Sequence, residues 1–141
     1  RKVVRRIVAL DIGSVRIGVA VSAPLGMVAQ WAAVLNARGD WLAELADIVA
    51  QYGGPVILIG MPRRTDGSEG PEAQRMRATA ETLKERFPEC EIRFWDERFT
   101  TTIAQQALLE ADVSRSGRKK KVDKIAATLL LQSYLDSGRN I

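Results

Sequence analysis

Apolar residues in the first third of the chain form short, closely spaced runs. These runs predict strands over residues 3–11 and 16–22, joined by the turn-forming pair Gly13-Ser14, and a third strand near 27–35. Strands joined by such short connections are typically antiparallel neighbours. The N-terminal part of the chain therefore predicts a three-stranded β-meander.

Helical periodicity and short apolar runs alternate through the rest of the chain. The run at 55–60 is apolar throughout, which is typical of a strand buried on both faces, and 92–95 is predicted as the next buried strand. Apolar spacing and capping residues predict helices over 41–52, 71–86, 102–111 and 124–136. Strands separated by helices must run parallel to share one sheet. We therefore expect one α/β domain over residues 1–141, with the meander and two parallel strands in a mixed sheet flanked by helices.

Composition removes several classes of active site. The chain contains no histidine, which excludes Ser-His-Asp and Cys-His catalysis, HExxH zinc sites and nucleases with a histidine base. Cys90 is the single cysteine, so a disulfide framework and a paired-cysteine zinc site are excluded. We expect its thiol to be a small buried apolar group and the setting to be reducing and cytoplasmic.

Charge and hydropathy bear on the partners of the chain. There are 21 Lys and Arg against 17 Asp and Glu, a net charge of +4, which is compatible with a nucleic-acid partner. No apolar run approaches the roughly 18 residues needed to span a bilayer. The basic start, RKVVRRIVAL, lacks the apolar core of a signal peptide. We therefore expect no membrane association.

Acidic residues stand where secondary structure is predicted to change. Asp11 ends the first strand, Asp96 and Glu97 follow strand 92–95, and Asp123 precedes the last helix. In layered α/β folds such positions meet around a crevice. Carboxylates without histidine or cysteine suit Mg²⁺ or Mn²⁺. One or two such ions can activate water and stabilise the leaving oxygen of a phosphoryl transfer.

Each acid also has a simpler structural interpretation. Asp123 is a favoured type of helix N-cap, and Asp11 could be a turn residue before Gly13. Asp96 and Glu97 could form a solvated strand end paired with neighbouring arginines. Because all of them occur at element boundaries in this order of elements, the combined pattern favours a site.

Basic residues cluster in two segments near these acids. Segment 114–121, SRSGRKKK, is predicted to be a loop before Asp123 that binds phosphates over the site, with a solvated loop as the simpler alternative. Loop 61–70 leads into a helix N-terminus, which favours phosphate, although a plain turn and cap would look the same. The candidate nucleic-acid contacts are Arg16, Arg63, Arg64, Ser68, Arg98, Arg115, Arg118, Lys119, Lys120, Lys121 and Lys124.

Tryptophan rings offer stacking surfaces for unpaired bases. Trp41 and Trp95 fall on predicted core elements, so packing is their expected role. Trp31 lies on the least regular of the predicted strands, and for it both roles stay open.

Four motifs resemble the YqgF/RuvX family across about residues 5–136. They are LDIGSVRIGVAVS, GMPRRTDGSEG, FWDERFTT and KKKVDKIAATLLLQSYL, in this order. The resemblance implies an RNase H-like fold with a five-stranded mixed sheet, related to RuvC Holliday-junction resolvases, and a divalent-metal-dependent endonuclease. It implies that Asp11, Glu97 and Asp123 are the metal ligands and catalytic residues. The family often has Lys where this chain has Val15, which puts one phosphate contact in doubt.

Asp96 and Glu97 are expected to differ in role. Neighbouring strand residues point to opposite faces of a sheet, so both carboxylates cannot face one crevice if the strand persists. Glu97 has the longer reach and matches the ligand of the family. Asp96 is therefore expected to support the site, by bracing it or a neighbouring backbone.

The resemblance implies two candidate substrates, which are branched DNA such as Holliday junctions and the 5′ end of the small-subunit ribosomal RNA precursor. Two symmetric cuts in a four-way junction need a homodimer, whereas trimming an RNA end does not. Two other classes stay open: a nucleic-acid-binding module without catalysis, and an actin-like ATPase or sugar kinase, whose phosphate loop resembles LDIGS. The latter scaffold needs two such domains, and 141 residues supply one.

Overall fold

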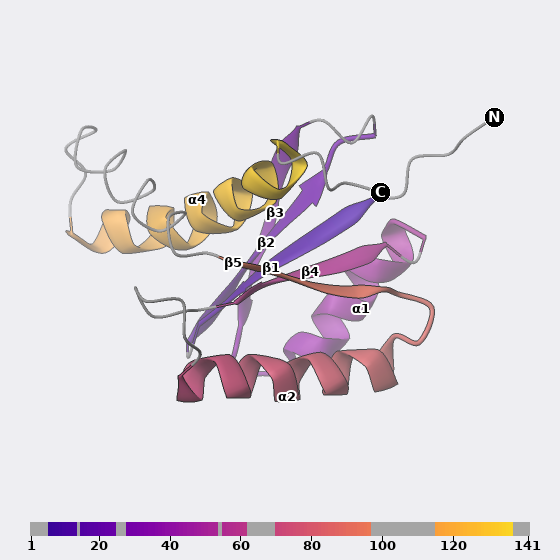
Figure 1. The fold of residues 1–141 in the computed structure, drawn as a ribbon. Helices are drawn as coiled ribbons and strands as arrows, with labels where there is room; N and C mark the ends of the chain where they lie inside the picture. Colours follow the sequence, from indigo (N-terminus) through magenta and orange to yellow (C-terminus); the bar gives the residue numbers. More distant parts are fainter. Residues whose placement is uncertain are drawn as a thin grey trace.

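The computed structural model describes residues 6–13, 15–24, 28–53, 55–61, 70–96 and 115–136. For Asp96 and residues 115–125 it describes the backbone alone. Within these ranges a five-stranded sheet lies between two helical layers (Figure 1). Its strands are β1 (Ile7–Ile12), β2 (Arg16–Ser22), β3 (Ala29–Asn36), β4 (Val56–Met61) and β5 (Ile92–Asp96).

The strand order is β3-β2-β1-β4-β5, which places β1 at the centre of the sheet. β1 pairs antiparallel with β2, and β2 pairs antiparallel with β3. β4 pairs parallel with β1 and with β5. This topology confirms the predicted meander followed by two parallel strands. The C-terminal ends of β1, β4 and β5 therefore lie on the same side of the sheet, where functional side chains of α/β folds gather.

Three helices belong to the described part of the chain: α1 (Trp41–Gln51), α2 (Pro71–Arg86) and α4 (Arg115–Asp136). α1 and α2 lie on one face of the sheet and α4 lies on the other (Figure 1). Side-chain alternation along β1 supplies both layers, because Val8 and Leu10 face α1 and α2 while Ile7 and Ala9 face α4. Among the described residues, no helix is both long and apolar enough to cross a membrane.

Local sequence explains where α1 and α2 begin and end. Asp40 caps α1, since its Oδ1 accepts a hydrogen bond from the backbone N of Ala43 at 3.3 Å. Gly53 follows α1 with a φ of 66°, which glycine adopts without steric cost. Pro71 opens α2 at a position whose N–H would have no partner inside the helix. The buried face of α2 is the predicted one, with Ala73, Met76, Ala80 and Leu83.

α4 begins earlier than the sequence predicts. The predicted loop over 114–121 and the predicted helix start at 124 are wrong, because the helix runs from Arg115 to Asp136. Asp123 therefore lies inside the helix and is not its N-cap. Arg and Lys are good helix formers, and a helix already stabilised by tertiary packing extends readily through them. The predicted helix over 102–111 lies outside the described residues.

Candidate active site on the α4 face of the sheet

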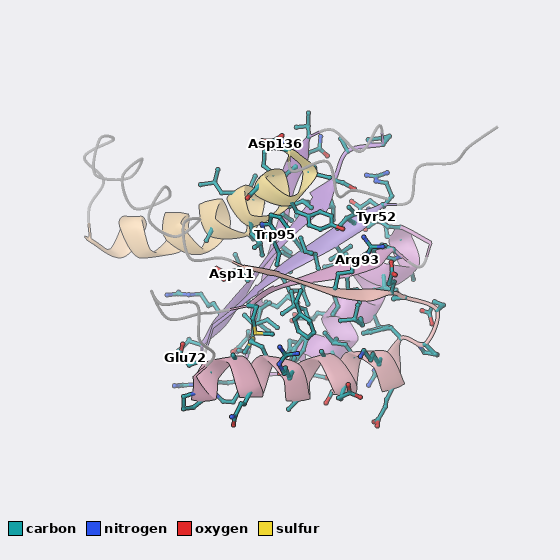
Figure 2. The ribbon with its side chains drawn as sticks, in the orientation of Figure 1. Asp11, Tyr52, Glu72, Arg93, Trp95 and Asp136 are labelled. Carbon is teal, nitrogen blue, oxygen red and sulfur yellow. The ribbon has the colours of Figure 1, made fainter. Side chains whose placement is uncertain are left out.

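Asp11 lies near the end of the central strand. It is the residue before the last one of β1, and it pairs with Gly18 of β2. The alternation of β1 puts its half-buried side chain on the same face as Ile7 and Ala9, which pack against α4. Figure 2 shows Asp11 in the part of the sheet below α4. The carboxylate of Asp11 therefore belongs to the layer between the sheet and α4.

Asp123 lies on the helix that covers this face. The sheet-facing side chains further along α4 are Ala127, Leu130, Leu131 and Tyr134, all of them buried. Asp123 precedes Ala127 by four residues, so its position continues the same stripe about one turn earlier. This C-terminal part of α4 packs on the first half of β1. Figure 1 shows the N-terminal half of α4 on the side where β4 ends and α2 begins.

Gly18 of β2 pairs with Asp11 and carries no side chain. It is buried and faces α4, because its neighbour Ala20 in the alternation packs in the core under that helix. α4 packs across β1, β2 and β3.

Two residues of β5 hold the C-terminal turns of α4. Arg93 Nη1 donates a hydrogen bond to Tyr134 Oη at 2.6 Å, and its Nε donates to Glu91 Oε2 at 3.0 Å. Trp95 Nε1 donates to Ser133 Oγ at 3.2 Å. The rings of Trp95 and Tyr134 meet edge to face, with centroids 5.2 Å apart. The hydrogen bond to Tyr134, and after it the one to Glu91, raise the pKa of Arg93, so its guanidinium stays charged.

Gln132 connects α4 to the opposite edge of the sheet. Its Oε1 accepts a hydrogen bond from the backbone N of Ala29, the first residue of β3, at 2.9 Å. Its Nε2 donates to Asp136 Oδ1 at 2.9 Å. Because β3 and β5 are the two edge strands, the three consecutive residues from Gln132 to Tyr134 fasten α4 to both edges.

A groove of about 410 Å³ runs along β5 beside α4. Its lining residues are Ile92, Arg93, Phe94, Trp95 and Tyr134. Arg93, the cation among them, is engaged by Tyr134 and Glu91. The groove is therefore part of the contact between β5 and α4.

The predicted acids are described to different extents. Asp11 is seen with its side chain, Asp123 as a position on α4, and Asp96 as the last residue of β5, paired with Met61. Glu97 lies outside the described residues. Among the side chains that the structure describes, no three His, Cys, Asp or Glu residues form a group that could hold a metal ion. The full ligand set therefore stays a prediction.

The predicted basic residues fall into three groups. Arg16 begins β2, with a half-buried side chain. The residues on the N-terminal half of α4 are Arg115, Arg118, Lys119, Lys120, Lys121 and Lys124. The residues outside the described ranges are Arg63, Arg64, Ser68 and Arg98.

Several packing predictions are confirmed. Trp41 packs partly buried against the α1/α2 core, and Trp95 packs against the α4 core. Cys90 is a buried thiol. Trp31 is 44% exposed on edge strand β3. The hydrogen bonds from β5 to α4 were missed, because alternation places Arg93 and Trp95 on one face but does not reveal their partners.

Comparison with known proteins connects this architecture to one family. The family described as "RuvX: Holliday junction resolvase" matches residues 5–137. A protein of Clostridium beijerinckii named "Putative pre-16S rRNA nuclease" is 46% identical over 134 residues, which cover 93% of this chain and 96% of that protein. A protein of the same name from Desulforamulus reducens is 44% identical over 137 residues, covering 94% and 98%.

Solved structures show the same fold at low sequence identity. Fowlpox virus resolvase in complex with Holliday junction DNA superposes with a TM-score of 0.58 at 16% identity, covering 96% of this chain and 99% of that one. Thermus thermophilus RuvC in complex with a Holliday junction superposes with a TM-score of 0.51 at 12% identity, covering 96% and 98%. These likenesses concern the fold, and they confirm the expected RNase H-like architecture.

The family match spans nearly the whole chain, and the relatives match it over nearly their whole length. The mixed sheet has the expected order, and Asp11 lies on its central strand as the sequence motif predicts. This protein therefore belongs to the RuvX family of nucleases.

Proposed function

We propose that this protein is a divalent-metal-dependent endonuclease that cleaves structured nucleic acid, with the 5′ end of precursor 16S ribosomal RNA as its first candidate substrate. The observation that carries the proposal is the placement of Asp11, on the central strand, in the layer covered by the helix that bears Asp123. The RNA substrate is supported by the names of relatives that are 44–46% identical. Branched DNA is supported by the description of the family.

Asp11, Glu97 and Asp123 would hold one or two Mg²⁺ or Mn²⁺ ions. The donors fit such ions, because they are hard carboxylate oxygens and the chain has no histidine to favour zinc. When bound, these ions supply the Lewis-acid chemistry that activates water and stabilises the leaving oxygen of a phosphodiester. Asp11 is half-buried on the face of β1 that α4 covers.

The pleat of β5 supports the choice between the two neighbouring acids. Phe94 packs against the α1/α2 core, and Trp95 packs against the α4 core. If this alternation continues, Asp96 falls on the α1/α2 side and Glu97 on the α4 side. This alternation supports the proposed ligand role of Glu97 and the supporting role of Asp96.

The helical form of the basic segment changes which residues are expected to reach the substrate. Successive residues of a helix point about 100° apart, so the consecutive residues from Arg118 to Lys121 cannot all face the site. Lys119 and Lys120 precede Asp123 by four and three residues, which places them on the same side of α4. We propose that Lys119 and Lys120 contact phosphates beside the metal site.

The test is the variant Asp11→Asn, with Asp47→Asn on the exposed side of α1 as the matched control. Cleavage of precursor 16S RNA, a four-way DNA junction and single-stranded DNA is measured with Mg²⁺ or Mn²⁺. Asp11→Asn should lose at least about 100-fold in rate, because even residues that only support metal ligands contribute 10- to 100-fold. Nucleic-acid binding in the absence of cleavage should persist in both variants.

Two results would contradict the proposal. Full cleavage by Asp11→Asn would remove this residue from the active site. Failure of the wild-type protein to cleave any of the three substrates with Mn²⁺ present would favour a binding module instead. Cleavage of the junction in preference to RNA, together with a dimer in solution, would move the substrate to branched DNA.

A further inference from the structure

We propose that the polar contacts that fasten α4 to the two edge strands position Asp123 against Asp11, and that Arg93 and Tyr134 are positioning residues for the metal site. We call these contacts the α4 attachment. They are the hydrogen bonds of Gln132, Ser133 and Tyr134 with Ala29, Trp95 and Arg93. The inference rests on the proposed function, since it assumes that Asp11 and Asp123 bind one metal site.

The α4 attachment provides directional contacts that the apolar core of this layer lacks. Beneath α4 the sheet presents aliphatic and small side chains such as Ile7, Ala9 and Ala20. Contacts of this kind are non-directional, so they specify the rotation of a helix less sharply than hydrogen bonds do. Hydrogen bonds, in contrast, are specific in distance and angle. The polar contacts therefore add directional constraints on the rotation of α4 to those of apolar packing.

The bond between Arg93 and Tyr134 is the strongest of these contacts. It joins a charged donor to a hydroxyl on a side chain that is 3% exposed, at 2.6 Å. Hydrogen bonds from charged donors are shorter and stronger than those between neutral groups. Glu91 holds the other side of the same guanidinium, which limits the positions that Arg93 can take.

The geometry of a helix transmits this constraint to the proposed ligand. Tyr134 and Asp123 are eleven residues apart on α4, which corresponds to about 16 Å along the helix axis. A rotation of about 10° moves an atom at the outer radius of a helix, about 6 Å from its axis, by about 1 Å. Side chains of a catalytic or binding site must be held within about 0.5 Å of their productive positions. A small rotation of the C-terminal turns is therefore sufficient to disturb a site about half the length of α4 away.

The experiment uses Tyr134→Phe, which removes the hydroxyl and keeps the ring that contacts Trp95. Affinity for Mn²⁺ is measured by calorimetric titration without substrate, and the melting temperature is measured on the same preparations. Loss of a residue that orients a metal ligand typically lowers metal affinity by 10- to 100-fold, and we expect a loss of about 10-fold. Cleavage should fall at limiting Mn²⁺ and recover at saturating Mn²⁺.

Two control variants separate positioning from loss of stability. Val49→Ala removes buried side-chain atoms from α1 on the opposite face, and it should lower the melting temperature without changing Mn²⁺ affinity. Tyr52→Phe makes the same chemical change at a tyrosine on that face, beneath Arg6, and should leave Mn²⁺ affinity unchanged. The double variant Arg93→Gln/Tyr134→Phe should bind Mn²⁺ about as weakly as either single variant, because both remove the same bond.

The outcomes distinguish this inference from the proposed function. If Asp11→Asn loses Mn²⁺ binding but Tyr134→Phe binds Mn²⁺ as tightly as the wild-type protein, the metal site stands and the positioning role is wrong. If Val49→Ala weakens Mn²⁺ binding as much as Tyr134→Phe, the effect comes from stability alone and the positioning role is again wrong. If the wild-type protein binds no Mn²⁺, both proposals fail.

Discussion

The two faces of the central sheet are closed by different kinds of contact. On the α1/α2 face, the described core consists of apolar side chains such as Leu45, Ile59 and Leu83. On the α4 face, hydrogen bonds at the edge strands also join the helix to the sheet. The one buried polar residue among those described, Ser22, lies on the α4 side, where its Oγ accepts a hydrogen bond from the backbone N of Ile7 at 2.8 Å.

This difference separates stability from alignment. Burial of apolar surface stabilises both layers in proportion to area, and it specifies orientation less sharply than hydrogen bonds do. Polar contacts add little net stability, but they specify geometry and are costly to break once buried. The α1/α2 layer is therefore expected to support folding, and the α4 layer to support folding and the geometry of the proposed site.

The sharpest test of this comparison is a pair of equal substitutions, one in each layer. Leu45→Ala and Leu130→Ala both remove a leucine that is at most 1% exposed. Each should lower the free energy of unfolding by about 2–5 kcal/mol, as measured by urea denaturation. Leu130→Ala should in addition weaken Mn²⁺ binding, because it leaves a cavity in the core on which α4, the helix that carries Asp123, is packed. Equal Mn²⁺ affinity in the two variants would remove the distinction between the layers.

A smaller effect is expected from charge on the two faces. Lys119→Gln with Lys120→Gln should lower the slope of log affinity against log salt by about 1–2, because each phosphate contact contributes about 0.7–0.9. Lys84→Gln with Arg86→Gln removes the same charge from the exposed side of α2. That control should leave the slope unchanged, as measured by RNA binding at several salt concentrations. An equal reduction of the salt slope in both pairs would indicate general electrostatic attraction between the protein and RNA, rather than phosphate contacts made by α4.

The smallest effect concerns the cap of α1. Asp40→Ala removes the acceptor of the hydrogen bond from Ala43 and should lower the free energy of unfolding by about 1 kcal/mol. Cleavage per folded molecule should stay at the wild-type rate, since α1 lies on the face away from Asp11. A loss of cleavage without a loss of stability would show that the α1/α2 layer also contributes to the site.

Much of the fold could be predicted because its signals are local. Strand β2 has the predicted bounds, 16–22, and α2 has the predicted bounds, 71–86. The continuous apolar run of β4 correctly indicated a strand buried on both faces, since all six of its residues are buried. The start of α4 was missed because a run of Arg and Lys suits a solvated loop and a helix equally well.

The residues of the candidate site could be predicted, but the hydrogen bonds that hold α4 on the sheet could not. Asp11 was identified from its place after an apolar strand, and alternation then places it on the α4 face. The partners of α4 could not be found in this way, because Arg93 and Tyr134 are 41 residues apart and Ala29 and Gln132 are 103 apart.

The sequence by itself determined the order of the described elements, the buried faces of α2 and β4, the exclusion of histidine chemistry and the membership of a nuclease family. These properties follow from periodicity, composition and motifs, which act over a few residues at a time. The tertiary structure alone decided that α4 extends back through the basic segment and that its last turns bind both edge strands. Those features depend on how a helix lies on a twisted sheet, which no short stretch of sequence specifies.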